Sequence, residues 1–381
     1  MPDSGKTGVL PAEAIARLID SGAIALAGPL RPRQLQPASL DLTLGARAWR
    51  VRASFLPSRA RTVAERLGDG LTMHEVSLEN GAVLERGCVY VVELNERVSL
   101  PETVSGAANP KSSTGRIDVF VRLVTDYGAA FDEIPQAYNG PLYAEVSPRT
   151  FSILVRRGSS LSQLRLKAGA CALRDAEMRA LHEETPLIDA PADIDGGVGV
   201  RVKIAGDANE IIGWRARRHA ALIDVDAPGA LAAEDYFEPM AAPASGFIIL
   251  DPDEFYILAS KEALTVPPDY AAEMTPINTG LGEFRVHYAG FFDPGFGWSA
   301  QRSNGSRAVL EFFPHRELDP YESWFSACIR LDDLPTMMAQ LSASDVPEGG
   351  KGIPRFHSPN EEPSGLTIAY MVDLDGSLIR L

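Results

Sequence analysis

The stretch "CVYVVELNERVSLPETVSGAANP" (88–110) decides the fold, because "EFYILASKEALTVPPDYAAEMTP" (254–276) repeats its order of apolar and turn residues. The matching residues stand 166 positions apart: Glu96 with Glu262, Pro101 with Pro267 and Pro110 with Pro276. Self-similarity at a fixed distance is the sequence signature of a repeated structural unit. We therefore expect one domain to occur twice in the chain.

The same spacing continues on both sides of this stretch. Downstream, Glu145 in "YAEV" precedes Glu311 in "VLEF" by 166 positions, and upstream "AWRVR" (48–52) precedes "GWRAR" (213–217) by 165. A steady offset over nearly a hundred residues favours duplication over two unrelated domains with similar strand spacing. The sequence predicts a first copy at 1–185, a linker at 186–198 and a second copy at 199–381.

Each copy is built from short alternating or apolar runs such as "SLDLTLG" (39–45) and "FSILV" (151–155), bounded by Gly, Pro, Asn and Asp. This pattern is typical of strands in a barrel or sandwich. Two helices are predicted: one over 11–22, with Pro11 near its start and Gly22 past its end, and one near 334–341. The fold class is mainly β with few helices.

The composition indicates a soluble protein. Net charge is −15, from 36 basic and 51 acidic residues, so a nucleic-acid backbone would be repelled by the overall field. No apolar run is long enough to span a membrane, and the start of the chain lacks the pattern of a signal peptide. The three cysteines are far apart and odd in number, which suits a reducing compartment. We expect a cytoplasmic protein without nucleic-acid or membrane partners.

Two short motifs carry chemistry, and each is complete in only one copy. "NPKSSTGRID" (109–118) offers an ammonium, hydroxyls and a guanidinium, the donors that phosphate oxygens need, although it is not a Walker loop. Its counterpart "TPINTGLGEF" (275–284) has lost most of them. "HYAGFFDPGFGW" (287–298) has the Asp-Pro-Gly chemistry of a tight hairpin, which the first copy lacks. This complementary loss predicts one site between the copies.

With these motifs the chain resembles the 2′-deoxycytidine 5′-triphosphate (dCTP) deaminases of the dUTPase-like superfamily. The matching stretches are "QPASLDLTLG" (36–45), "KSSTGR" (111–116), "GSSLSQLRL" (158–166), "AGFFDPGFG" (289–297) and "VLEF" (309–312). The resemblance implies two tandem dUTPase-like distorted β-barrels with a few short helices. It also implies sites formed where barrels meet, and a homo-oligomer is an open possibility that no local motif decides.

The resemblance assigns roles residue by residue. The triphosphate contacts would be Lys111, Ser112, Ser113 and Arg116, with Ser112 and Arg116 also near the reacting water. Ala289 would offer its carbonyl to that water and Asp293 would contact the sugar, within a nucleoside hairpin that also includes Phe291 and Gly295. Glu311 would be the catalytic carboxylate, and Glu145 is the weaker candidate because the hairpin of its own copy is degraded.

The expected reaction is hydrolytic deamination of dCTP to dUTP and ammonia. Zinc deaminases use clustered His and Cys ligands, and here no two cysteines are close and the six histidines are isolated, so we expect no zinc and no protein metal site. General acid–base work by a carboxylate remains, with Mg²⁺ accompanying the triphosphate. Two alternatives stay open: a dUTPase-like pyrophosphatase, alone or combined with deamination, and a non-catalytic nucleotide-binding protein.

Overall fold

The computed structural model describes residues 7–207, 209–275 and 290–297, together with 299–301, 307–309, 326–328, 334–343, 346–350, 355–361, 367–372 and 378–380. The chain divides into two compact units, residues 1–296 and 297–381. The first unit contains two structural repeats, which we call repeat 1 (residues 7–168) and repeat 2 (residues 175–296). We call the second unit the C-terminal unit.

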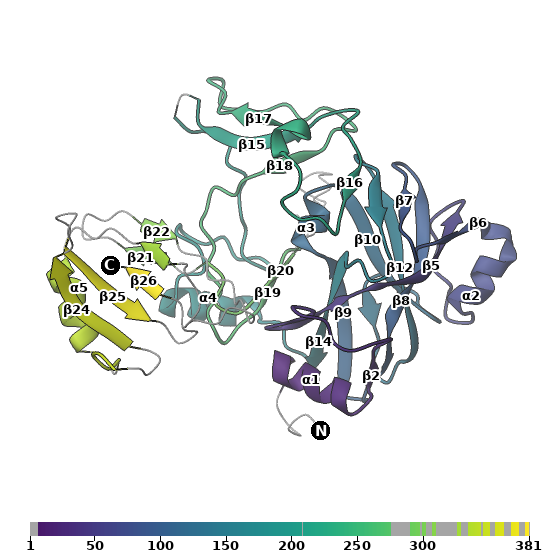
Figure 1. The fold of residues 1–381 in the computed structure, drawn as a ribbon, viewed down its shortest axis with the longest axis horizontal. Coiled ribbons are helices and arrows are strands. Elements are labelled where there is room, and N and C mark those ends of the chain that lie inside the picture. The colour runs from purple at the N-terminus through teal and green to yellow at the C-terminus, as the bar shows by residue number, and fades with distance from the viewer. Residues whose placement is uncertain are drawn as a thin grey trace. The chain divides into compact units, whose positions relative to one another are not determined.

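Repeat 1 contains two six-stranded sheets, and its strands β7 and β13 belong to a third, smaller sheet (Figure 1). Its elements are β1 (Gly8–Val9), α1 (Ala12–Asp20), β2 (Ile24–Ala25), β3 (Leu35–Gln36), β4 (Ser39–Leu42), β5 (Leu44–Val51), α2 (Val63–Arg66), η1 (Leu67–Leu71), β6 (Thr72–Ser77), β7 (Ala82–Leu84), β8 (Val89–Ser99), β9 (Val104–Pro110), α3 (Ser112–Gly115), β10 (Val119–Thr125), β11 (Glu133–Ile134), β12 (Asn139–Pro148), β13 (Ile153–Val155) and β14 (Ser162–Ala168). One sheet has the order β11-β9-β14-β4-β3, with β1 on β14. The other has the order β10-β12-β8-β5-β6, with β2 on β8.

A large apolar cluster joins the two six-stranded sheets of repeat 1, and a smaller one lies around Val91 and Tyr143. Fully buried leucines from the first sheet, such as Leu40 and Leu164, belong to the same cluster as Val92 and Ala144 of the second. Helix α1 adds Ile15 and Leu18 from its apolar face. Alternation along the strands places these side chains on one face of each sheet, and their removal from water is the main stabilising term of the fold.

The second repeat is smaller in the described part of the chain. Its elements are α4 (Asp175–Glu184), β15 (Ile211–Ala216), β16 (Ile223–Asp224), η2 (Ala233–Asp235), β17 (Phe237–Ala241), β18 (Tyr256–Leu258), β19 (Ala272–Glu273) and β20 (Phe291–Phe292). The sheet β17-β15-β18 is antiparallel, and β19 pairs with β20.

Strand registers confirm the predicted duplication. In repeat 1, Trp49 and Arg50 of β5 pair with Val91 and Tyr90 of β8. The corresponding pairs in repeat 2 join Trp214 and Arg215 to Ile257 and Tyr256. The two glutamates predicted to match make the same kind of contact, because each accepts a hydrogen bond from a backbone N–H. Glu96 accepts from Thr43 at 2.9 Å, and Glu262 accepts from Arg201 at 2.8 Å. Both carboxylates are buried, at 1% and 3% exposure.

The two repeats are joined by a shared sheet and by side-chain contacts. Strand β16 of repeat 2 runs parallel to β13 of repeat 1, next to β7. Beyond it, both ends of the Arg156 guanidinium donate to Asp224, at 2.7 and 2.8 Å. Phe151 packs edge-on against Tyr236 and Phe237. Bidentate Arg–carboxylate geometry and aromatic packing fix the relative register of the repeats here.

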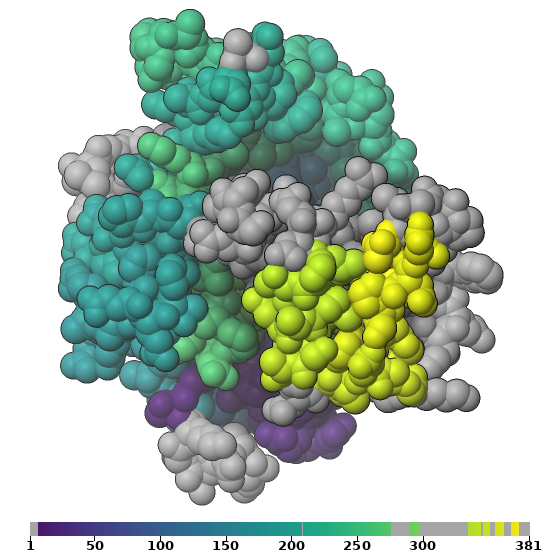
Figure 2. Space-filling view, turned by 90° about the vertical axis from the view of Figure 1, so that its left-hand side faces the viewer, coloured from purple at the N-terminus to yellow at the C-terminus, as the bar shows by residue number. Residues whose placement is uncertain are grey.

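The main sheet of the C-terminal unit has a strand order that differs from those of the sheets in the two repeats. The elements of this unit are β21 (Ser299–Gln301), β22 (Arg307–Val309), β23 (Ser326–Cys328), α5 (Leu334–Ser342), β24 (Arg355–Glu361), β25 (Thr367–Val372) and β26 (Leu378–Arg380). Four strands have the order β23-β26-β25-β24, with β23 parallel to β26. Helix α5 and strands β24 and β25 of this unit lie together, drawn yellow-green to yellow in Figure 2. No described strand of repeat 1 forms such a β-α-β-β-β arrangement.

The structure confirms the predicted mainly β fold and both predicted helices, α1 and α5. Pro11 immediately precedes α1, and Gly22, with φ +77°, follows it. Helix α4 was not predicted, because none of its residues is buried and its sequence has no apolar stripe. Among the described residues no helix is long and apolar enough to cross a membrane.

Candidate functional site

The predicted anion motif forms a short turn of helix between two strands of repeat 1. Lys111 lies immediately before α3, and its N–H bonds the Leu161 carbonyl at 3.0 Å. Ser112, Ser113 and Arg116 are exposed around this turn. The backbone of the motif is therefore anchored to the barrel, while its donor side chains face solvent, as an anion site requires.

Lys111 has a carboxylate partner that the sequence did not point to. Its ammonium forms an ion pair with Asp41 of β4, whose side chain is almost fully buried. Burial raises the pKa of Asp41, and the nearby Lys111 ammonium opposes that shift. The other oxygen of Asp41, Oδ1, is buried without a hydrogen-bond partner among the described residues. Asp41 thus fixes the position of the Lys111 ammonium beside the start of α3.

The predicted Asp-Pro-Gly turn is present in repeat 2 directly after β20, and β20 itself pairs with β19. Strand β20 leads into a turn in which the Phe296 N–H bonds the Asp293 carbonyl at 3.1 Å, and Gly295 takes a φ of +80°. Phe292 and Phe296 stack edge-on across the turn, with centroids 4.8 Å apart. Partial burial raises the pKa of Asp293, and the neighbouring Arg165 opposes the shift. The Asp-Pro-Gly prediction of a tight turn is confirmed.

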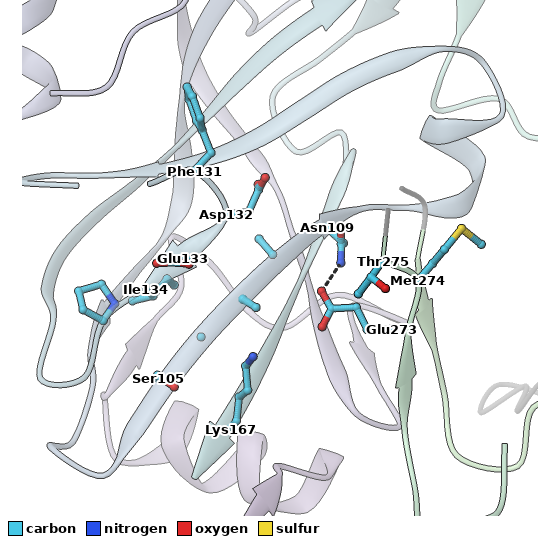
Figure 3. A pocket seen from close by; sticks show the side chains of 14 residues that line it. Ser105, Asn109, Phe131, Asp132, Glu133, Ile134, Lys167, Glu273, Met274 and Thr275 are labelled. Carbon is cyan, nitrogen blue, oxygen red and sulfur yellow. Dashed lines mark hydrogen bonds between the residues drawn. The ribbon is translucent and has the colours of Figure 1, made fainter. Parts of the chain in front are cut away.

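The phosphate motif of repeat 1 lies next to the paired strands β19 and β20 of repeat 2, which we call the hairpin segment together with the turn that follows β20. Asn109, two positions before Lys111, donates from Nδ2 to Glu273 Oε1 of β19 at 3.2 Å (Figure 3). A cavity of about 460 Å³ opens beside this contact, and we call it the inter-repeat pocket. Its lining comes from β9, from the Phe131–Pro135 segment, from Lys167 and from residues 273–275 of repeat 2. The structure therefore brings the two predicted half-sites to one face of repeat 1.

Two carboxylates of repeat 1, Glu145 and Asp132, have raised pKa values, and Asp132 lines this pocket. Glu145 of β12 is buried, and its Oε1 accepts the Ser54 hydroxyl at 3.0 Å while Oε2 has no partner among the described residues. Burial raises the pKa of Glu145. Burial also raises the pKa of Asp132 to about 7, although the Leu123 N–H donates to its Oδ1 at 2.7 Å. Arg122 faces Glu145 across the β10–β12 ladder.

Two predicted site residues, Ala289 and Glu311, lie outside the residues that the structure describes. Lys111, Ser112, Ser113, Arg116, Phe291, Asp293, Gly295 and Glu145 are all described, and their roles stay predictions. Sequence reasoning missed Asp41, Asp132 and Arg165. Asp41 and Arg165 lie within quoted strand stretches, where a charged residue at a core-facing position was the available signal.

No group of three or more His, Cys, Asp or Glu side chains in the described part of the chain is arranged to hold a metal ion. Cys88 and Cys171 are free thiols. The chemistry that the described residues can supply is therefore anion binding by ammonium, hydroxyl and guanidinium groups, and proton transfer by buried carboxylates with raised pKa values.

The fold and the two half-motifs define a duplicated β-barrel protein with an anion motif in one copy and a hairpin in the other. Residues 6–170 match the family model of the 2′-deoxycytidine 5′-triphosphate deaminase N-terminal domain, and residues 174–318 match that of its C-terminal domain. The crystal structure of 2′-deoxycytidine 5′-triphosphate deaminase from Agrobacterium tumefaciens is 49% identical, with a TM-score of 0.73. The match covers 80% of this chain and 91% of that one. The chain belongs to the dCTP deaminase family, as its motifs predicted.

Two curated proteins are also similar. A dCTP deaminase from Halorubrum lacusprofundi is 28% identical over 133 residues, which are 35% of this chain and 63% of that protein. A bleomycin resistance protein from Klebsiella pneumoniae is 48% identical over 73 residues, 19% of this chain and 58% of that protein. The chain thus spans about three fifths of the length of these curated relatives.

The family models meet between residues 170 and 174, ahead of α4. This junction lies earlier than the expected linker at 186–198, and α4 is the counterpart of α1. Each helix precedes a matching contact, since the Ser99 N–H bonds the Ala23 carbonyl and the Thr265 N–H bonds the Leu187 carbonyl. The predicted limits of the two copies stay a prediction.

Proposed function

We propose that the chain hydrolyses dCTP to dUTP and ammonia at a site shared by the phosphate motif of repeat 1 and the hairpin of repeat 2. Membership of the deaminase family supports this reaction. The contact between Asn109 and Glu273 carries the assignment of the site, because it brings repeat 2 within two residues of Lys111. Substrate and activity are proposals for this chain.

The triphosphate would bind around α3. The exposed hydroxyls of Ser112 and Ser113 and the guanidinium of Arg116 would donate to its oxygens, with the Lys111 ammonium held in place by Asp41. Lys111 gives a point charge rather than a bidentate fork, so it would neutralise charge more than fix geometry. Mg²⁺ would travel with the triphosphate, and no zinc would take part.

The base would lie against the hairpin, where water adds to C4 of the cytosine. A carboxylate takes one proton from that water as the C–O bond forms and delivers it to N3, which gives a tetrahedral intermediate with a hydroxyl and an amino group on C4. The same carboxylate then transfers the hydroxyl proton to the amino group, the C4–N bond breaks, ammonia leaves, and the C4 carbonyl of uracil forms. The carboxylate would be Glu311, as the resemblance to the family implies, with Glu145 as the alternative. Burial raises the pKa of Glu145, and a carboxyl group of raised pKa is better able to accept and return a proton. The Ala289 carbonyl would orient the water.

The test is release of ammonia and formation of dUTP from dCTP by the wild type and by Glu311→Gln and Glu145→Gln. Loss of general acid–base catalysis should lower kcat by about 10²- to 10⁴-fold in the variant that removes the catalytic carboxylate. Glu93→Gln is the matched control, since Glu93 is a partly exposed strand glutamate paired with Arg47 at 3.1 Å. Activity retained in both carboxylate variants would overturn the assignment of these residues.

The products separate the remaining alternatives. Formation of dUMP and pyrophosphate would mean pyrophosphatase activity, alone or after deamination. Unchanged dCTP, bound but not converted, would mean a nucleotide-binding protein. EDTA should weaken dCTP binding by removing Mg²⁺, whereas a zinc-selective chelator should have no further effect.

Partners and location are proposed on the same basis. We place the chain in the cytoplasm, where dCTP and reducing conditions for Cys88 and Cys171 are found. The resemblance implies active sites formed where two barrels meet, so we propose a homo-oligomer. Sedimentation of the full chain would measure its oligomeric state.

A second candidate function concerns the C-terminal unit. Outside the two deaminase models, the longest stretch is 319–381, and residues 297–381 form their own compact unit. We infer that the 73 residues similar to the bleomycin resistance protein lie within residues 297–381, and we propose that this unit contributes to bleomycin resistance. Calorimetric titration of the full chain with bleomycin tests this. Absence of binding, with dCTP turnover intact, would rule the second function out.

A further inference from the structure

Arg165 of β14 is buried in an unusual way for an arginine. The residue is 3% exposed, yet it belongs to repeat 1 and its described polar partners all belong to repeat 2. Taking a guanidinium out of water is costly unless its donors and charge find partners. A buried cation whose partners come from another domain therefore indicates a joint between the two domains.

The partners of Arg165 are the two strands of the hairpin segment. Nη1 donates to the Ala272 carbonyl at 2.8 Å and Nη2 to the Phe292 carbonyl at 3.3 Å. Ala272 and Phe292 are paired opposite each other in the β19–β20 ladder. One planar guanidinium thus bridges both strands and ties them to the barrel of repeat 1.

The same guanidinium also touches the two side chains next to the turn. It lies over the ring of Phe291, with Cζ 4.0 Å from the centroid, and Nη2 is 3.5 Å from Asp293 Oδ1. Cation–π stacking and charge attraction therefore set the directions of Phe291 and Asp293, the hairpin residues that were assigned to the nucleoside. Lysine has neither the fork nor the plane for this combination.

A second contact joins the same segment to repeat 1, because Asn109 donates to Glu273, the residue after Ala272. Within the segment, Gly290 runs so close to β19 that a Cβ there would lie 2.8 Å from the Cβ of Met274, so the two strands are packed tightly together. The Arg165 guanidinium links this segment to β14, the strand that pairs with β9 at the start of the phosphate motif.

We propose that Arg165 is a positioning residue, which holds the nucleoside hairpin of repeat 2 against the phosphate motif of repeat 1 so that one chain builds one nucleotide site. The inference rests on the proposed function and adds that the hairpin must be held next to the phosphate motif for the reaction to occur. Loss of Arg165 should release the hairpin while leaving the phosphate motif, with its Lys111–Asp41 pair, intact.

The experiment compares dCTP turnover with tripolyphosphate binding in Arg165→Met and Arg165→Lys. Tripolyphosphate uses the phosphate motif alone, so its inhibition constant should stay within about twofold of the wild type. We expect KM for dCTP to rise about tenfold or more and kcat to fall, because a misplaced binding element costs orders of magnitude in rate. Arg165→Lys should recover only part of this loss.

The matched control is Arg157→Met, which removes an arginine paired with Glu79 at 3.1 Å on the exposed surface. Its kinetic constants should equal those of the wild type. Amide exchange at residues 290–293 gives a readout without substrate, and it should become faster in both Arg165 variants.

The outcomes are distinguishable. If the wild type does not convert dCTP, the proposed function fails while amide exchange still tests the joint. Unchanged KM and unchanged exchange at 290–293 in Arg165→Met would overturn the proposal. A parallel loss of dCTP and tripolyphosphate affinity would also overturn it, because that result would mean general damage to repeat 1. If Arg165→Met does not fold, Arg165→Lys keeps the charge and carries the same comparison.

Discussion

Asp132 has the most strongly perturbed carboxyl group near the inter-repeat pocket. Burial raises its pKa from 3.8 to about 7, with further contributions from the charges of Glu145 and Glu133, while the Leu123 amide and Arg122 oppose the shift. A carboxyl group with this pKa is largely protonated at weakly acidic pH. This titration links the stability of repeat 1 to pH.

The sign of that link follows from the direction of the shift. Because the pKa is raised in the folded state, the contribution of Asp132 to stability is complete below about pH 4 and is lost as pH rises through 7. The full difference of about 3 units corresponds to roughly 4 kcal/mol. We expect the free energy of unfolding of the wild type to fall between pH 5 and pH 8.

Asp132→Asn should flatten this pH dependence, since the amide oxygen can still accept the Leu123 N–H and no proton is exchanged. Urea unfolding at pH 5, 6.5 and 8 measures it. Asp20→Asn, at the exposed end of α1, is the control and should keep the wild-type slope. An equally steep slope in Asp132→Asn would show that another group is responsible.

At the scale of elements, the start of β5 lies very close to the backbone of its neighbour β8. A Cβ added to Gly45 would lie 2.5 Å from the backbone carbonyl oxygen of Glu93, in the β5–β8 pair where the register shifts between Leu44 and Ala48. A backbone oxygen cannot move aside as a flexible side chain can, so the strands must separate. Gly45→Ala should cost about 2 kcal/mol or more of stability.

Gly68→Ala is the matched control for that variant. Nothing lies within 4 Å of an added Cβ at Gly68, and its φ is not in the left-handed region. Its stability should therefore equal or slightly exceed that of the wild type. Chemical denaturation of both variants measures the difference, and equal stabilities would contradict the close approach of β5 to β8.

At this scale the sequence predicted what local chemistry decides. Pro11 and Gly22 marked the ends of α1, and Asp-Pro-Gly marked the turn after β20. Burial and pairing across the chain could not be predicted in the same way. Arg165 and Asp41 read as polar positions in apolar strands, and their partners, Phe292 and Lys111, lie 127 and 70 positions away. Only the folded chain brings these groups together.

Over the whole molecule, the predicted duplication holds, but the spacing between copies changes at the hairpin. The Ala108 N–H bonds the Asp132 carbonyl in repeat 1, and the Met274 N–H bonds the Gly290 carbonyl in repeat 2. The first pair is 24 positions apart and the second 16, so the offset drops from 166 to 158. A fixed offset therefore could not locate every counterpart. The sequence also did not indicate the separate sheet of the C-terminal unit.

The repeats differ in how well they bury matching positions. Thr43 and Arg201 are counterparts, because each donates its N–H to a buried glutamate. Leu42, just before Thr43, is 0% exposed, whereas Val200, just before Arg201, is 47% exposed. In repeat 1, β14 pairs with β4 and covers these residues. The described part of repeat 2 contains no counterpart of β14. Less apolar surface is therefore buried in the described part of repeat 2.

Repeat 2 should therefore open more readily than repeat 1. Local opening is easiest where few apolar contacts hold a sheet. We expect the amide of Ile257 in β18 to exchange at least about 100-fold faster than that of Val91 in β8, its counterpart, after correction for intrinsic rates. Hydrogen exchange followed by mass spectrometry measures both in one sample. Equal protection would mean that the sheet of repeat 2 is covered in solution by another surface, and a concentration dependence of that protection would identify the surface as a second copy of the chain.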